Sequence, residues 1–185
     1  PPPNVIASTD KHFVARGRYL AENVTGCIGC HSTIDEEVDA QPVVEGTGGK
    51  EEQTWLPSDE TMGQLTAGNI TPLGVGERTE GEVLHAVSTG IHKDGHAMFP
   101  APTFAKPTES DAKSIVSNLR TLKSGERSAT TRRLSVVLTE VANKTAAPPT
   151  WSVPPGVNDV SAKGEYLATV SECLYCHTPN KGNTP

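Results

Sequence analysis

Aromatic side chains are scarce in this chain. They make up 4% of its 185 residues, and all hydrophobic types together reach only 35%. That length provides room for one ordinary domain or two small ones, so the supply of core-forming side chains is thin. Glycine (17) and proline (15) are frequent by comparison. The composition therefore predicts a chain rich in loops, or an interior filled partly by something other than side chains.

Three further absences narrow the functional classes. No run approaches 18 consecutive apolar residues, so no transmembrane helix is expected. The chain opens on three prolines without a charged-then-apolar signal segment, so the signal of an exported protein would already be gone. The net charge of −6 mixes acidic and basic residues, which argues against nucleic-acid binding and against polybasic docking on an anionic membrane.

Four cysteines are present, in two pairs with the same context. Residues 27–31 (CIGCH) and 173–177 (CLYCH) both read C-x-x-C-H, the attachment motif of c-type haem. Thiols at this spacing lie on one turn of helix and reach both vinyl groups of one haem, and the following histidine directs its imidazole at the iron. We therefore predict two covalently bound haem c groups. The predicted attachment residues are Cys27, Cys30, His31, Cys173, Cys176 and His177, with His31 and His177 as iron ligands.

Other uses of cysteine pairs remain open at this point. A lone C-x-x-C also serves as a thioredoxin-like redox pair or as half a zinc site, and four cysteines can form two disulfides in an exported chain. Neither the redox pair nor the zinc site requires a histidine directly after the second cysteine. Here that histidine occurs twice, which favours haem attachment.

A repeated segment precedes each cysteine motif. The segments ARGRYLA (residues 15–21) and AKGEYLA (residues 162–168) agree at five of seven positions, and each predicts a short helix leading into a haem-binding turn. Glycine costs about 1 kcal/mol inside a helix. Its matched positions therefore predict a crossing helix in close approach, with the tyrosine packed at the crossing; the alternative is a glycine tolerated at the surface. The residues concerned are Gly17 and Tyr19 in the first copy and Gly164 and Tyr166 in the second.

Further helices are predicted between the motifs. A capping box opens at Thr79, apolar residues follow on one face, and Gly90 ends that helix. Residues 109–123 form the clearest amphipathic helix, the expected partner of the helix around Gly17. Residues 32–78 show little periodicity and are interpreted as loops draped over the haem. Residues 124–160 are interpreted as a proline-rich linker, in which a short helix is predicted from Leu134 to Val141.

A low-spin electron carrier needs a second axial ligand, most often methionine or histidine. The chain has two methionines, Met98 and Met62. Met98 directly precedes the closing helix of the first unit, the expected order for a small haem domain, so we predict Met98 as the ligand. Met62 or a histidine are the alternatives, and a buried gap-filling role is the alternative for Met98 itself.

The first unit resembles the class I c-type cytochromes. More narrowly, it resembles the cytochrome c subunits of bacterial membrane-associated dehydrogenases that oxidise alcohols, gluconate and other sugars. The resemblance covers residues 10–123 and resumes at Ala162. The motifs that carry it are GRYLA (17–21), CIGCH (27–31), NITP (69–72), TEGE (79–82), TGIHKDG (89–95), MFP (98–100) and residues 110–122.

The resemblance implies an all-α fold. The chain is expected to comprise a class I cytochrome c-like haem domain with long loops (1–123), the linker (124–160) and the start of a second, incomplete haem unit (161–185). It also implies that Met98 occupies the ligand position, although the family has methionine followed directly by proline and an aromatic residue, and here Phe99 intervenes. By the same resemblance Asn69 and Thr71 lie beside the haem as propionate or supporting contacts. Simple turn formation is the alternative for both.

The largest departure from the family is the C-terminal end. Only eight residues follow His177, too few for the loops, methionine ligand and closing helix of a second haem domain. Three explanations remain open: the chain is part of a longer protein, a histidine of the first unit serves the second haem, or a neighbouring protomer supplies the ligand. The histidines available within the chain are His12, His85, His92 and His96.

The function that these observations predict is one-electron transfer by a periplasmic or otherwise exported bacterial dihaem cytochrome c. The expected partners are a redox donor, such as a dehydrogenase subunit, and a downstream respiratory acceptor, and the protein itself breaks no substrate bond. Two rivals stay open. One is a dihaem peroxidase, which needs a haem with an open sixth position; the other is a polymer of protomers with stacked haems.

Overall fold

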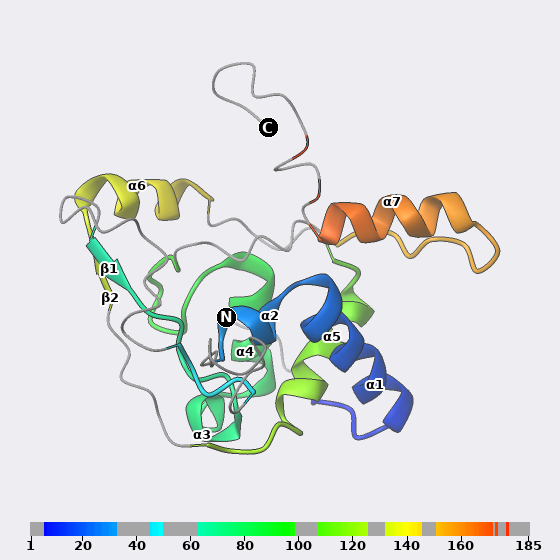
Figure 1. Ribbon diagram of the computed structural model, residues 1–185, viewed down its shortest axis with the longest axis horizontal. Coiled ribbons are helices and arrows are strands. Elements are labelled where there is room, and N and C mark those ends of the chain that lie inside the picture. Colours follow the sequence, from blue (N-terminus) through cyan, green and yellow to red (C-terminus); the bar gives the residue numbers. More distant parts are fainter. Residues whose placement is uncertain are drawn as a thin grey trace, which may run out of the picture.

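The computed structural model describes residues 6–32, 45–49, 63–98, 107–125, 132–145 and 151–171, together with Cys173 and His177. The helices in chain order are α1 (Lys11–Tyr19), the π-helical turn η1 (Leu20–Val24), α2 (Cys27–Cys30), α3 (Pro72–Val75), α4 (Glu80–Thr89), α5 (Glu109–Leu119), α6 (Val136–Thr145) and α7 (Val160–Val170). Two strands, β1 (Gly63–Leu65) and β2 (Arg132–Leu134), complete the described elements. Helices α6 and α7 lie along one side of a body built around α1, α4 and α5 (Figure 1). Within the described ranges no helix is both long and apolar enough to cross a lipid bilayer.

Helices α1 and α5 cross at Gly17. A Cβ atom placed on Gly17 would lie 1.8 Å from the carbonyl oxygen of Ser114, so the two backbones meet where only glycine fits. This confirms the predicted crossing between the first repeat copy and the amphipathic helix. The core surrounding the crossing consists of Leu20, Val75, Val83, Leu84, Ala112, Ile115, Val116 and Leu119.

Side-chain caps fix the start of α4 and α5. The Thr79 hydroxyl accepts from the Glu82 amide at 3.2 Å, and the Glu82 carboxylate accepts from the Thr79 amide at 2.8 Å, which confirms the predicted capping box. Gly90 ends α4 in a left-handed conformation, as predicted. At α5 the Thr108 hydroxyl accepts from the Asp111 amide at 3.1 Å.

Helix α5 ends at Leu119, short of the predicted end at Lys123. The amide and the hydroxyl of Thr121 both donate to the Asn118 carbonyl oxygen, each at 2.8 Å. In a continuing α-helix the Asn118 carbonyl oxygen would accept from the amide four residues later. Here Thr121 occupies it in a tighter turn, so the helix stops.

One small sheet joins the middle of the chain to its later part. Strands β1 and β2 pair antiparallel, with Gly63 opposite Leu134. Helix α6 follows directly, and its buried Leu138 packs with Leu65 of β1. A short helix is therefore present in this region as α6, but it spans Val136–Thr145 and not the predicted Leu134–Val141, because Leu134 belongs to β2. The interpretation of residues 32–78 as loops and of residues 124–160 as a linker is therefore wrong at β1 and β2, because three residues are too few to show alternation.

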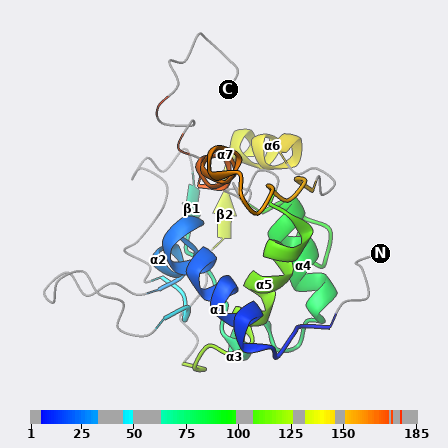
Figure 2. The same cartoon turned by 90° about the vertical axis from the view of Figure 1, so that its right-hand side faces the viewer.

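The second repeat copy forms α7, and it packs differently from α1. Tyr166 is 9% exposed and lies against the start of α5, whereas Tyr19 is 44% exposed. Among the described residues, no atom lies within 4 Å of a Cβ placed on Gly164. Figure 2 shows α7 nearly end-on above the α1–α5 pair. The prediction that both glycines and both tyrosines pack at a crossing is therefore wrong for Tyr19 and Gly164.

Candidate haem-attachment site

The first C-x-x-C-H motif forms a single helical turn, α2, held at the end of η1. The amide and hydroxyl of Thr25 both donate to the Leu20 carbonyl oxygen, at 2.8 and 3.0 Å, which closes the wide turn of η1. Gly26 then adopts a left-handed conformation with φ of 66°, and the chain enters α2. Because α2 is helical, the free thiols of Cys27 and Cys30 lie one turn apart, the arrangement that the motif predicts.

Both thiols of this turn are held in the neutral form. Cys27 is buried beside Ala21 and Ile28, and burial raises the pKa of its thiol, although a contact with the Thr25 hydroxyl at 3.2 Å acts in the opposite direction. Burial also raises the pKa of Cys30. A thioredoxin-like redox pair needs a thiol with a lowered pKa, so the structure argues against that alternative.

His31 directly follows the turn, and its ring orientation is fixed by hydrogen bonding. Its Nδ1 lies 2.7 Å from the carbonyl oxygen of Gly68, and its own carbonyl oxygen accepts from the Gly48 amide at 2.7 Å. A carbonyl can only accept, so Nδ1 carries the hydrogen and Nε2 keeps its lone pair. Burial lowers the pKa of His31, with the Gly68 contact opposing, and the ring is therefore neutral at pH 7. A neutral imidazole oriented through its Nδ1 hydrogen is the form that binds a metal, so these residues fit a covalently attached haem iron.

The segment that supplies the Gly68 carbonyl is itself held by buried hydrogen bonds. The Asn69 side-chain oxygen accepts from both the amide and the hydroxyl of Thr71, at 2.9 and 2.7 Å. The Ile70 amide donates to the Gly46 carbonyl oxygen at 2.7 Å. Asn69 and Thr71 thus form a turn, as the alternative reading of these residues predicted. Their contact with a haem stays a prediction, and the turn lies directly beside the residue that orients His31.

Met98 stands at the end of a hairpin that begins at Gly90. The Met98 amide donates to the Gly90 carbonyl oxygen at 2.7 Å, and Ile91 pairs with Ala97. The side chain of Met98 is half-buried. Its role as iron ligand stays a prediction, and Met62 lies outside the described residues.

Two stacked histidines clamp the same hairpin. The His92 and His96 rings stack with their centroids 4.5 Å apart, and the possible ligand atoms of His92, Asp94 and His96 lie within 4.8 Å of one another. Arg78 Nη2 lies 2.7 Å from His92 Nε2. A guanidinium only donates, so His92 Nε2 accepts and Nδ1 carries the hydrogen, 3.0 Å from the carboxylate of Asp94. In this tautomer the Nε2 lone pair of His92 is taken by Arg78, while Nδ1 faces the Asp94 carboxylate without completing a hydrogen bond.

The second C-x-x-C-H motif contrasts with the first in burial. Cys173 and His177 are exposed, while Cys27 is 8% exposed. Cys176 lies outside the described residues. Of the four other histidines considered as ligands, His12 is exposed and His85, His92 and His96 are half-buried.

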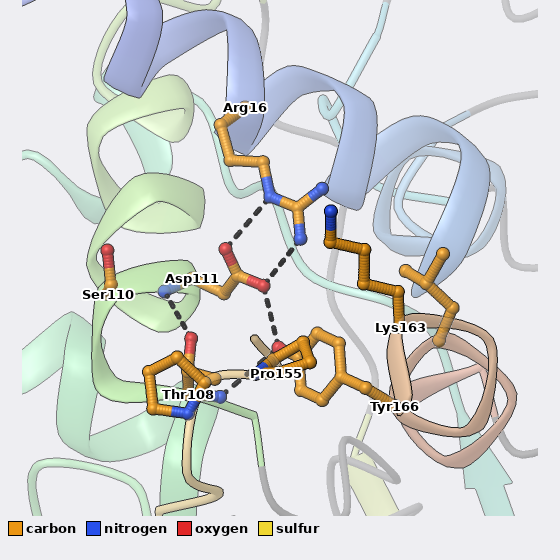
Figure 3. A pocket seen from close by; sticks show the side chains of 9 residues that line it. Arg16, Thr108, Ser110, Asp111, Pro155, Lys163 and Tyr166 are labelled. Atoms are coloured by element: carbon orange, nitrogen blue, oxygen red, sulfur yellow. Dashed lines mark hydrogen bonds and ion pairs between the residues drawn. The ribbon is translucent and has the colours of Figure 1, made fainter. Parts of the chain in front are cut away.

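A polar cluster between the two repeat copies was missed from the sequence. It joins Arg16 of α1 and Asp111 of α5 to Tyr166 of α7 (Figure 3). The only local signals were the capping pattern at Thr108 and the repeated tyrosine. Neither signal indicated that the Asp111 and Tyr166 side chains would meet, since the two residues are 55 positions apart in the sequence.

The geometry is that of a small helical unit that presents two neutral thiols on one turn and an oriented imidazole directly after it. No protein-family model matches the chain. The chain is similar to cytochrome c subunits of bacterial dehydrogenases, which confirms the resemblance inferred from its motifs.

Three such relatives illustrate the similarity. The cytochrome c subunit of alcohol dehydrogenase (quinone) from Gluconacetobacter polyoxogenes is 26% identical over 186 residues, covering 92% of this chain and 36% of the relative. The subunit of the same name from Gluconobacter oxydans is 30% identical over 57% of this chain and 20% of the relative. The gluconate 2-dehydrogenase cytochrome c subunit of Pantoea cypripedii is 30% identical over 56% of this chain and 22% of the relative. The chain thus spans about a third of the length of the first of these curated relatives.

Proposed function

We propose that this chain is a c-type cytochrome that carries single electrons and holds two covalently attached haem c groups. The observation that carries the proposal is the contact between His31 Nδ1 and the Gly68 carbonyl oxygen at 2.7 Å, one residue after a helical turn with two free cysteines. That combination leaves Nε2 of a neutral imidazole available as a ligand beside two anchoring thiols. The similarity to cytochrome c subunits supports the same conclusion.

Each residue of the first motif has a defined task in this proposal. Cys27 and Cys30 would anchor the haem through thioethers, and His31 Nε2 and Met98 would hold its iron. The bound haem supplies one-electron chemistry by cycling between Fe(II) and Fe(III). The buried turn of Asn69 and Thr71 keeps the Gly68 carbonyl in place, and so keeps the His31 ring from rotating.

The second motif is proposed to hold the second haem through Cys173, Cys176 and His177. Cys173 and His177 are exposed, so this haem is expected to have a larger exposed face than the first. Its sixth ligand is expected from a residue before Cys173, from further chain, or from a neighbouring subunit.

The proposed partners are redox proteins, with a dehydrogenase subunit as electron donor and a respiratory protein as acceptor. The support is that the relatives are named as subunits of alcohol and gluconate dehydrogenases. We propose the bacterial periplasm as the location. In this role the chain relays electrons and the dehydrogenase subunit performs the substrate chemistry.

Spectroelectrochemical titration of the purified protein tests the proposal. A cytochrome c of this kind takes up two electrons per chain in reversible one-electron steps, each accompanied by the change in the visible bands of a haem. Peroxide turnover without reversible cycling would favour the dihaem peroxidase. Absence of any visible haem band would overturn the proposal.

A further inference from the structure

The first turn of α5 carries a buried carboxylate that two other helices share. The Asp111 side chain is 11% exposed and receives a bidentate contact from Arg16 of α1: Nε donates to Oδ1 at 2.9 Å and Nη2 to Oδ2 at 2.7 Å. The position of a carboxylate in the first turn of a helix is itself favourable. The Arg16–Asp111 pair therefore offers a fixed, charged acceptor at the surface where α7 lies.

Tyr166 of α7 binds that acceptor through its side-chain hydroxyl. Its hydroxyl donates to Asp111 Oδ2 at 2.6 Å and accepts from the Thr108 amide at 3.2 Å. Both bonds are buried, and Figure 3 shows the ring directed at the Asp111 carboxylate from the side opposite Arg16. A hydroxyl that both donates and accepts in a buried site fixes its helix in position and orientation, and a hydrogen bond to a charged group is among the stronger ones.

The repeat shows that this contact is specific to the second copy. In α1 the glycine, Gly17, makes the close contact with α5, and Tyr19 is 44% exposed. In α7 the tyrosine makes the contact, and Gly164 meets nothing within 4 Å in the part of the chain that the structure describes. Two similar segments thus contact α5 through different residues, α1 through its glycine and α7 through the hydroxyl of its tyrosine.

A second contact holds the chain that leads into α7. The Ser152 amide donates to the Pro107 carbonyl oxygen at 3.0 Å, next to the start of α5. Helix α7 ends at Val170, and Cys173 follows Tyr166 by seven residues. The position of α7 on α5 therefore controls where the second C-x-x-C-H motif begins relative to the first unit.

We infer that the hydrogen bonds of Tyr166 to Asp111 and Thr108 dock α7 onto the first unit and thereby set the separation between the two haem-attachment motifs. Tyr166 is a positioning residue in this inference. The docking of α7 does not depend on the proposed function, whereas the separation of the two haems rests on it. The docking is a property of the polypeptide. Its consequence is that electrons pass between the two haems within one chain at a rate that depends on the docked geometry.

The test uses the full chain with Tyr166→Phe, which keeps the ring and removes only the hydroxyl. Loss of a hydrogen bond to a charged group predicts about tenfold or faster amide hydrogen exchange in residues 160–170. Exchange in α4 should stay unchanged. After flash reduction of one haem, electron equilibration between the haems should also slow in this variant.

The matched control is Tyr19→Phe, the same change at the corresponding position of the first copy. Within the described residues the Tyr19 hydroxyl makes no hydrogen bond, and the contact of Arg16 with its ring, 5.6 Å to the centroid, survives in phenylalanine. This control should match the parent in both measurements.

Each outcome separates the parts of the inference. Unchanged exchange of α7 in Tyr166→Phe overturns the docking. Faster amide exchange in α7 with an unchanged rate of electron transfer between the haems would show that the docking of α7 does not set their separation. A protein with fewer than two haems contradicts the proposed function, while the exchange experiment still decides whether Tyr166 docks α7.

Discussion

The Nδ1 atom of His31 lies 2.7 Å from the carbonyl oxygen of Gly68, and this contact joins the C-x-x-C-H turn to a segment 37 residues further along the chain. It determines which nitrogen of the imidazole carries the hydrogen. The turn of Asn69 and Thr71 holds the carbonyl in place. The predicted ligand therefore depends on residues that are not part of its motif.

The first prediction concerns that supporting turn. Asn69→Ala removes the acceptor of two buried Thr71 donors, so the free energy of unfolding should fall by about 1–3 kcal/mol. The loosened Gly68 carbonyl should also shift the midpoint potential of the first haem. Denaturant unfolding and potentiometry measure the two effects. Thr71→Ser keeps both donors and should leave the potential nearly unchanged; an equal shift in both variants would contradict the proposed support of His31.

The second prediction compares the two glycines of the repeat. Gly17→Ala places a methyl group 1.8 Å from the Ser114 carbonyl oxygen, so the helices must separate, at a cost of about 1–3 kcal/mol in the free energy of unfolding. Gly164→Ala meets nothing within 4 Å among the described residues and should stabilise α7 by up to about 1 kcal/mol. Denaturant unfolding of both variants provides the measurement. Equal destabilisation by the two changes would show that Gly164 also lies at a helix contact.

The third prediction concerns Met98. A thioether bound to ferric haem gives a weak charge-transfer band near the infrared edge and stabilises reduced iron. Met98→Ala should abolish that band and lower the potential of the first haem, whereas Met62→Ala should leave both nearly unchanged. Absorption spectra and potentiometry of the two variants decide between them, and the reverse pattern would assign the ligand to Met62.

The fourth prediction is a pH dependence of the α7 dock. Burial, followed by the hydrogen bond to Asp111, raises the pKa of Tyr166 above its ordinary value of 10.0. The neutral phenol is therefore favoured in the folded protein, so its contribution is complete below pH 10 and is lost as pH rises through the folded-state pKa. Arg16 keeps its charge throughout this range.

Unfolding free energies of the parent and Tyr166→Phe between pH 8 and pH 12 measure this dependence. The difference between the two proteins should be constant below about pH 10 and should shrink above it. A difference that grows with pH would contradict the assignment of Asp111 as the acceptor of the Tyr166 hydroxyl.

Local sequence patterns carried much of the fold and of the first site. The capping box at Thr79 and the stop at Gly90 depend on neighbouring residues only, and the structure has both where they were predicted. The helix crossing at Gly17 followed from the cost of glycine in a helix, which needs a packing reason.

Contacts between distant segments could not be predicted in this way. The partner of His31 Nδ1 is a backbone carbonyl, which has no sequence signal at all. The exposure of Tyr19 and the burial of Tyr166 depend on where each helix lies against α5, and the two segments agree at five of seven positions. Tertiary packing therefore decides which of the two repeated tyrosines is buried.

The intact mass of the protein under denaturing conditions tests the central claim most directly, because only covalent haem survives unfolding. The parent should carry the mass of two haems. Cys27→Ala with Cys30→Ala should carry one, and Cys173→Ala with Cys176→Ala should carry the other. A parent protein without added haem mass, or cysteine variants that keep both haems, would contradict the account.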